Sequence, residues 1–106
     1  MSRRPLIAGN WKMNLTIAEG KQLVQDVING LHALPHHKEV VFAPPFLQSI
    51  MVSELVSKTN NVFVAAQNCS AFANGAYTGE ISATMVKNAG MPYVLIGHSE
   101  RRDYFN

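Results

Sequence analysis

The amino-acid sequence predicts an α/β fold in which the strands of a parallel sheet alternate with helices. Short apolar runs without polar alternation recur along the 106 residues and end abruptly at glycine, proline or polar residues. Runs of this kind are typical of strands that are buried on both faces of a parallel sheet. Segments with apolar residues at helical spacing separate them, so we expect the order βαβαβαβ with right-handed crossovers.

The first unit is predicted to be a short strand over residues 5–9 followed by a long helix. Thr16 and Glu19 have the Thr-x-x-Glu spacing of a capping box, which marks the start of the helix. Gly20 and Gly30 would each weaken it by about 1 kcal/mol relative to alanine. The apolar residues at helical spacing are Ile17, Val24, Val27, Ile28, Leu31 and Leu34, and Pro35 ends the pattern.

The same reasoning applies to the later elements, each of which is bounded by a turn signal. In order, they are a strand over 39–43, a helix over 47–55, a strand over 62–66, a short helix over 82–88 with Gly90 as its C-terminal stop, and a strand over 93–96.

Composition limits the function classes. The chain has 47% hydrophobic and 15% charged residues, which indicates a globular domain, and its net charge of +2 is too small to suggest nucleic-acid or membrane binding. Cys69 is the single cysteine, so we expect no disulfide, no metal cluster and a reducing, cytoplasmic setting. His36 and His37 lack further ligands at metal-binding spacing and are interpreted as surface residues. Glycine-rich dinucleotide and triphosphate loops are absent from the sequence.

Polar residues follow the first and the last predicted strands directly. Asn10 and Lys12 come after the first strand, and His98 and Glu100 come after the last. Because sites in parallel α/β proteins form at the carboxyl ends of strands, we expect a site there in which Lys12 binds a phosphate or carboxylate. Asn10 would orient Lys12 or bind an oxygen. The alternative is a surface lysine beside a turn asparagine.

His98 is expected at the start of a helix, with Ser99 as the N-cap and Glu100 in the first turn. The partial positive charge of a helix N-terminus disfavours the imidazolium form. A neutral imidazole could donate a hydrogen bond to a carbonyl and transfer protons near pH 7. The alternative is a histidine that only satisfies hydrogen bonds of the loop.

The segment from Gln67 to Glu80 has no periodic pattern and is unusually long for a loop in a compact domain. Loops of this length are usually functional or disordered, and we favour an interaction role. The apolar residues Phe72, Ala76 and Tyr77 have no obvious internal use.

Five motifs, in order along the chain, resemble the triosephosphate isomerase family. They are Gly9–Asn14 (GNWKMN), Ala43–Phe46 (APPF), Ala66–Asn68 (AQN), Gly75–Ser82 (GAYTGEIS) and Ile96–Arg102 (IGHSERR). The resemblance implies that residues 1–106 form the N-terminal half, the first four βα units, of a single TIM (β/α)8 barrel domain, with the remainder absent from this chain. It also implies interconversion of dihydroxyacetone phosphate and glyceraldehyde 3-phosphate, a step of glycolysis and gluconeogenesis, without metal or cofactor.

The resemblance implies a role for each matching residue. His98 would be the neutral electrophile that polarises the substrate carbonyl, a role for which this family is the standard example. Lys12 would neutralise the substrate charge, Asn10 would contact the substrate, and Glu100 would lie near the lysine and tune the site. The family is homodimeric, and its protruding dimer loop resembles segment 67–80. The residues that match intersubunit contacts are Thr78, which touches the partner's site, and Glu80 with Arg101, a charge pair.

The sequence also departs from the family. The family's glutamate base, lid and main phosphate-binding backbone belong to the second half of the barrel, and no residue here matches them. Ala83 and Tyr77 replace a common proline and phenylalanine. We therefore expect the isolated 106 residues to be inactive. An alternative is a noncatalytic half-barrel that self-associates. Another, which is disfavoured because architecture alone would not reproduce both the Asn-x-Lys and the Gly-His-Ser-Glu-Arg-Arg motifs, is a different phosphate-binding barrel enzyme.

Overall fold

Four parallel strands and four helices alternate along the chain in a computed structural model, which describes residues 3–31, 35 and 37–106. The elements are β1 (Leu6–Asn10), α1 (Ile17–Gly30), β2 (Glu39–Ala43), α2 (Phe46–Val56), β3 (Val62–Ala66), α3 (Ala83–Asn88), β4 (Tyr93–Val94) and α4 (Ser99–Phe105). The strands pair in the order β1-β2-β3-β4, and every pair is parallel. This confirms the α/β class and is the arrangement of the first half of a TIM barrel.

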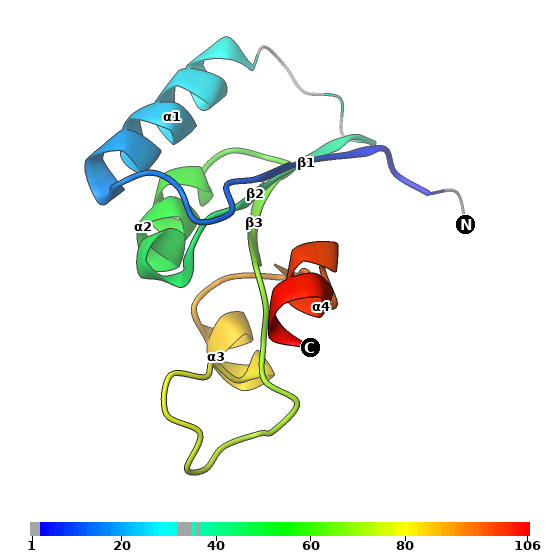
Figure 1. Ribbon diagram of the computed structural model, residues 1–106. Helices are drawn as coiled ribbons and strands as arrows, with labels where there is room; N and C mark the ends of the chain where they lie inside the picture. The colour runs from blue at the N-terminus through cyan, green and yellow to red at the C-terminus, as the bar shows by residue number, and fades with distance from the viewer. Residues whose placement is uncertain (1–2, 32–34, 36) are drawn as a thin grey trace.

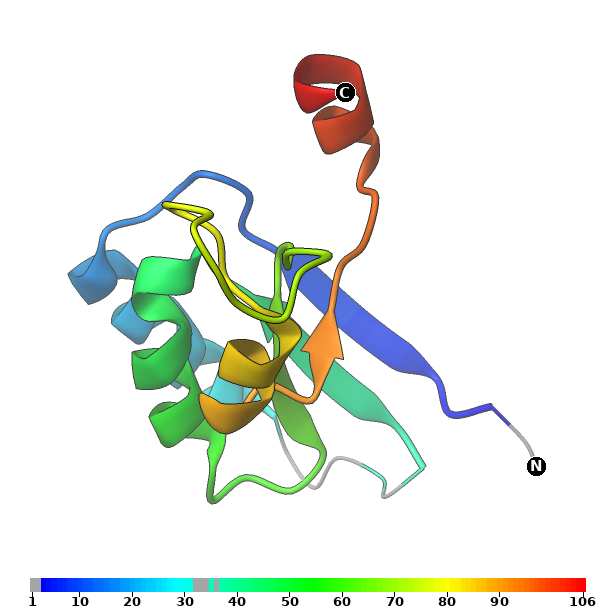
Figure 2. The same cartoon turned by 90° about the horizontal axis from the view of Figure 1, so that it is seen from below.

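The helices α1, α2 and α3 lie on one face of the sheet, and α4 stands apart beyond the end of β4 (Figure 1, Figure 2). The main core fills the space between these three helices and the sheet. Its buried members are Trp11, Val24, Phe42, Val52, Val56, Val62, Val64, Ala66, Val86 and Met91. Side chains alternate between the two faces of a strand, so Val41, Ala43 and Ala65 form a second, smaller cluster on the opposite face.

The two outer strands differ from the prediction that every strand is buried on both faces. The central strands β2 and β3 confirm it, because most of their residues are buried. In β1, however, Leu6 and Ile7 are 47% and 66% exposed. In β4, Tyr93 is 37% exposed, and Ile96, which lies beyond the end of β4, is 77% exposed. Each outer strand has a neighbour on one side only, and no helix in the described part of the chain covers the face opposite α1 to α3.

The last strand is also shorter than predicted. It covers Tyr93 and Val94 rather than 93–96, although Leu95 still donates its backbone N–H to the carbonyl of Ala66 at 2.8 Å. The chain then turns at Gly97, whose φ of +64° favours glycine. The polar residues that follow the last strand therefore begin in a turn that leads away from the sheet toward α4.

The capping box at the start of α1 is confirmed. The Thr16 hydroxyl accepts a hydrogen bond from the Glu19 N–H at 3.3 Å, and the Glu19 carboxylate accepts one from the Thr16 N–H at 2.9 Å. The bonds from Thr16, above all the one from its backbone, lower the pKa of Glu19. The helix ends at Gly30, earlier than the predicted apolar pattern, while Leu34 and His36 lie outside the described residues.

The two glycines of α1 have different surroundings. A Cβ atom added at Gly20 would lie 1.9 Å from Oε1 of Gln48 and 2.7 Å from the Trp11 ring, so this position allows α1 to pack closely on α2. At Gly30, a Cβ atom would meet nothing within 4 Å. Helix propensity alone treats both glycines as equally unfavourable, whereas packing makes a side chain at position 20 the more harmful change.

We therefore expect opposite results from two alanine substitutions. In the full-length protein, Gly20→Ala should lower the free energy of unfolding by about 1–3 kcal/mol through overpacking. Gly30→Ala should leave it unchanged or raise it by up to about 1 kcal/mol, since alanine is the better helix former. Denaturant unfolding of both variants measures this difference. Equal stability of the two would show that the contact between α1 and α2 adjusts freely.

Candidate active site

The structure brings the predicted site residues of the first and last strands together. Nζ of Lys12 lies 2.6 Å from Oε1 of Glu100, although the two residues are 88 positions apart. Nδ1 of His98 lies 3.6 Å from Oε2 of the same carboxylate. Asn10, the last residue of β1, accepts the backbone N–H of Lys12 with Oδ1 at 2.9 Å. Parallel pairing places the carboxyl ends of β1 and β4 at the same end of the sheet. Because these are the two outer strands, the segments that follow them, with Lys12 and Glu100, span the distance between the strand ends.

The backbone of Lys12 has an unusual conformation. Its φ is +56°, in the left-handed region that costs a residue other than glycine on the order of 1–3 kcal/mol. Neighbouring side chains bind both of its backbone polar groups. Oδ1 of Asn10 accepts its N–H, and Nε2 of Gln67 donates to its carbonyl at 2.9 Å.

Gln67 is a site residue that the sequence reasoning missed. Its Nε2 donates to the carbonyls of Lys12 and Ala43, both at 2.9 Å, and lies 3.4 Å from Oδ1 of Asn10. One amide therefore joins the carboxyl ends of β1, β2 and β3. A signal was present, because Gln67 directly follows the apolar strand that ends at Ala66. It is therefore a polar residue at a strand end, as Lys12 and His98 are.

The ion pair between Lys12 and Glu100 is accessible to solvent, with the two side chains 54% and 43% exposed. The hydrogen bond from Lys12 is the main cause of the lowered pKa of Glu100; desolvation opposes it, and charge interactions with Lys12 and His98 add to the lowering. Because the pKa of Glu100 is lower in the folded state, its carboxylate stabilises the fold at pH values above the ordinary pKa of glutamate. This contribution is lost as the pH falls through the lowered pKa. Near neutral pH, Glu100 is therefore a carboxylate beside the lysine.

His98 is itself the N-cap of α4, which corrects the prediction that Ser99 has this role. Nδ1 of His98 accepts the backbone N–H of Glu100 at 3.1 Å. At 3.6 Å, the carboxylate of Glu100 is too distant to compete as a hydrogen-bond partner of Nδ1. Because an accepting nitrogen carries no hydrogen, a neutral imidazole in this geometry has its N–H at Nε2, where it can donate to a ligand. His98 thus satisfies the turn, as the alternative interpretation expected, and still has a donor available.

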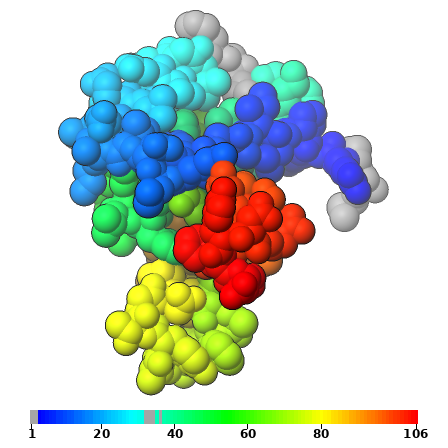
Figure 3. Space-filling model, in the orientation of Figure 1, coloured from blue at the N-terminus to red at the C-terminus, as the bar shows by residue number. Residues whose placement is uncertain are grey.

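The long segment 67–80 protrudes from the rest of the molecule as a loop (Figure 1, Figure 3). Contrary to the expectation of no internal use, the rings of Phe72 and Tyr77 stack on each other, with centroids 4.2 Å apart and planes at 4°. The Ser70 N–H also donates to the carbonyl of Ile81 at 2.7 Å and closes the base of the loop.

The residues that match dimer contacts are exposed. Thr78 and Glu80 lie on the protruding loop, and Arg101 lies on α4, with its guanidinium 5.1 Å from the centroid of the Phe105 ring. Within residues 3–31, 35 and 37–106, no salt bridge joins Glu80 to Arg101. Their pairing across subunits stays a prediction.

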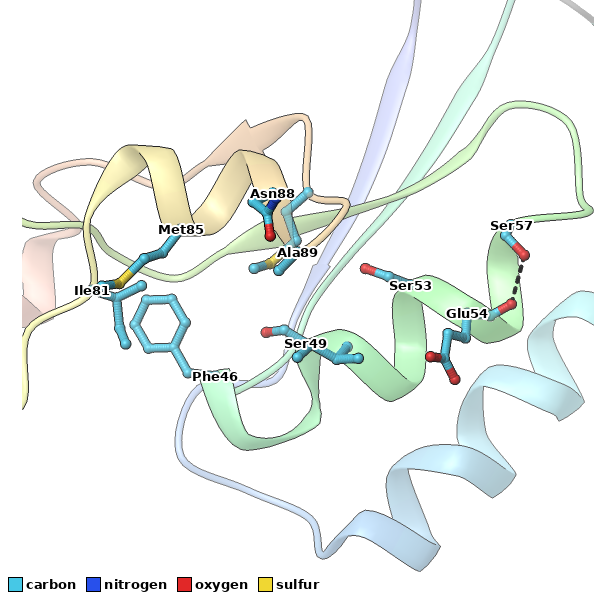
Figure 4. A pocket seen from close by; sticks show the side chains of 11 residues that line it. Phe46, Ser49, Ser53, Glu54, Ser57, Ile81, Met85, Asn88 and Ala89 are labelled. Carbon is cyan, nitrogen blue, oxygen red and sulfur yellow. Dashed lines mark hydrogen bonds between the residues drawn. The ribbon is translucent and has the colours of Figure 1, made fainter.

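A groove of about 630 Å³ lies between α2 and α3, away from these strand ends. Figure 4 shows Phe46, Ile81 and Met85 at one end of it and Glu54 and Ser57 at the other. The groove contains no lysine, arginine or histidine, so it lacks the chemistry of an anion site. The strand ends, and not this groove, therefore form the candidate active site.

Neither a cluster of metal-ligating side chains nor a membrane-spanning helix is present in the described part of the chain. No group of three or more histidine, cysteine, aspartate or glutamate side chains could hold a metal ion there. Among the same residues, none of the helices has the length and apolar character needed to cross a bilayer.

Comparisons with known proteins show the family of this chain. The family model described as triosephosphate isomerase matches residues 5–106. Triosephosphate isomerases of Thermoanaerobacter pseudethanolicus and Caldanaerobacter subterraneus are 47% and 48% identical over 103 residues, which are 97% of this chain and 40% of each relative. That of Porphyromonas gingivalis is 41% identical over 104 residues, which are 98% of this chain and 41% of the relative. The chain thus spans about 40% of the length of these relatives, and it belongs to the triosephosphate isomerase family.

Proposed function

We propose that a full-length protein carrying this sequence interconverts dihydroxyacetone phosphate and glyceraldehyde 3-phosphate in the cytoplasm, as a step of glycolysis and gluconeogenesis. In this proposal, residues 1–106 form the first half of one barrel domain. The observation that supports this proposal is the convergence of three side chains at the strand ends. The carboxylate of Glu100 lies 2.6 Å from Nζ of Lys12 and 3.6 Å from Nδ1 of His98. The reaction needs neither a metal nor a cofactor, because proton transfer between adjacent carbons requires only acid–base groups.

Each side chain has a role that its geometry supports. The N–H at Nε2 of His98 donates to the substrate carbonyl oxygen as negative charge develops in the enediolate. Lys12 neutralises the anionic substrate, Asn10 contacts it, and Glu100 keeps the ammonium group in place. Glu100 is itself bonded to Lys12, so we assign the proton-abstracting base to a glutamate outside residues 1–106.

Isomerisation assays on the full-length protein, with each triose phosphate as the starting substrate, test this function. Turnover in both directions that persists in the presence of a metal chelator is expected. The disfavoured alternative, a different phosphate-binding barrel enzyme, predicts no turnover of either triose phosphate but saturable binding of another phosphorylated compound. Either result decides between the two enzymes, because both assays use the same purified protein.

We also propose that the full-length protein is a homodimer in which the loop 67–80 contacts the partner subunit. Thr78 would reach the partner's site, and Glu80 would pair with Arg101 across the interface. The protrusion of the loop and the exposure of these side chains support this assignment.

Replacing residues 74–78 with a short Gly-Ser turn should therefore convert the dimer to monomers. The expected cause is the loss of the stacked Phe72–Tyr77 pair together with Thr78. Sedimentation at micromolar concentration measures the change. A control variant with Thr59→Ser and Asn60→Gly, in the turn before β3, should remain dimeric. Persistence of the dimer in the loop variant would remove the loop from the interface.

A second candidate applies to the 106 residues taken alone, namely a noncatalytic half-barrel that self-associates. The observation that favours it is the uncovered face and edge of β1, where Leu6 and Ile7 are exposed. Unpaired strand edges and apolar patches promote association. We expect an oligomer without isomerase turnover by light scattering and assay. A cooperative monomer would contradict the association, and turnover that is lost on His98→Ala would contradict the inactivity.

A further inference from the structure

The side-chain amide of Gln67 lies at the junction of three strand ends. Its Nε2 bonds the carbonyls of Lys12 and Ala43 and lies within 3.4 Å of Oδ1 of Asn10. The Ala43 carbonyl also accepts the N–H of Trp11 at 3.0 Å, so the segment before Lys12 is attached to the same point on β2. The amide does not touch His98 or Glu100 within hydrogen-bonding distance in the described structure.

The bond from Gln67 bears on the position of the lysine ammonium group. Lys12 adopts a left-handed backbone, which an amino acid with a side chain does not prefer. Its N–H is bound by Asn10 and its carbonyl by Gln67, so side chains stabilise the peptide groups on both sides of its Cα. The exposed ion pair with Glu100 is weak by itself, because solvent screens it. The two backbone bonds act directly on the conformation of Lys12 and therefore add a second constraint on where Nζ can lie.

We propose that Gln67 is a positioning residue for the anion site: through the Lys12 carbonyl it holds Lys12 in the left-handed conformation from which Nζ meets its anionic ligand. This inference rests on the proposed function, in which Lys12 binds the phosphorylated substrate. Without the amide, Lys12 relaxes toward ordinary backbone angles, and Nζ leaves the position where Glu100 and the ligand converge. Gln67 acts through Lys12 and does not contact the substrate.

A glutamine elsewhere in the chain provides a matched control. Nε2 of Gln48 donates to the carbonyl of Leu15 at 2.7 Å, and Leu15 also has a positive φ, of 74°. Gln48 is 3% exposed, whereas Gln67 is half-buried, so the amide of Gln48 is at least as important for packing as that of Gln67. It differs from Gln67 in that it bonds neither Lys12 nor Asn10. A purely structural role would make the two glutamines behave alike.

The test compares Gln67→Met and Gln48→Met with the wild type in the full-length protein. Calorimetry gives the Kd of inorganic phosphate, steady-state assays give KM and kcat for the triose phosphate, and denaturant unfolding gives stability. Loss of a bond that fixes a charged group should raise the phosphate Kd and the KM of Gln67→Met about tenfold. Gln48→Met should lose stability but keep both constants within about twofold.

A double substitution tests whether Gln67 acts through the lysine. In a Lys12→Met background, adding Gln67→Met should change the phosphate Kd by less than about twofold, because the interaction is already absent. Additive effects would overturn the proposal, as would Gln67→Met with wild-type constants. If Gln67→Met does not fold, Gln67→Asn, whose amide is withdrawn by one methylene, should show the same rise in Kd. Unchanged binding in that variant would also overturn it.

The outcomes separate this inference from the proposed function. A wild-type protein that binds phosphate without turning over triose phosphates would contradict the isomerase assignment, while the Kd comparison would still decide the role of Gln67. A wild-type protein that does not bind phosphate would overturn both the anion site and the positioning role.

Discussion

Substitution of His98 in the full-length protein is expected to lower kcat at least about 100-fold, because it removes a hydrogen-bond donor to the developing oxyanion. His98→Ala also removes the N-cap of α4 and with it about 1 kcal/mol of stability. His98→Asn separates the two effects. Asparagine is a good N-cap that can accept the Glu100 N–H, but it lacks the Nε2 donor of the ring.

Steady-state kinetics and thermal unfolding of both variants measure these effects. His98→Asn should be nearly as stable as the wild type and should still have the large loss of kcat, with a smaller change in substrate affinity. His37→Asn, in the connector before β2, is the control and should keep full activity. A near-normal kcat in either His98 variant would remove this residue from the chemistry.

Lys12→Met is expected to weaken phosphate binding and to slow the reaction together. The ammonium neutralises charge that is present in both the substrate and the transition state, so its loss affects ground-state and transition-state binding alike. Hydrogen bonds to charged groups are worth about 1.5–3 kcal/mol, which corresponds to roughly 10- to 150-fold in the Kd of a nonreactive phosphate ester. Removal of Lys12 also leaves Glu100 without its partner.

Titration with the nonreactive ester at two ionic strengths distinguishes the interpretations of Lys12. The wild-type Kd should rise with salt, whereas the Kd of Lys12→Met should depend on salt much less. Lys87→Met, in the last turn of α3, removes a lysine from another element and should leave the Kd unchanged. Unchanged affinity in Lys12→Met would mean that Lys12 is not an anion contact.

The sequence alone determined the elements whose signals are local. The capping box of Thr16 and Glu19 and the strands 39–43 and 62–66 were predicted correctly, because capping and burial on both faces leave their patterns within a few residues. The parallel α/β class followed from the alternation of these elements. The candidate site residues could be predicted because they are polar residues that directly follow an apolar strand.

Only the tertiary structure decided what depends on neighbours distant in the chain. Helix propensity treats Gly20 like any other helical glycine, yet its environment is set by Gln48 of α2 and the Trp11 ring. The N-cap role of His98 depends on a turn that no propensity scale distinguishes from one capped by Ser99. Exposure of β1 depends on which faces have a covering layer, and a strand's own pattern does not contain that information.

The candidate site combines both kinds of information. The residue types of Asn10, Lys12, His98 and Glu100 were readable in sequence, and the parallel arrangement of the strands predicted that they lie at the same end of the sheet. The bonds from Gln67 to Lys12 and Ala43 were not predictable, because they depend on the left-handed backbone of Lys12 and on distances between three strand ends. Sequence patterns report which groups stand at the edge of the sheet. Their mutual hydrogen bonds arise only when strands from distant parts of the chain are packed side by side.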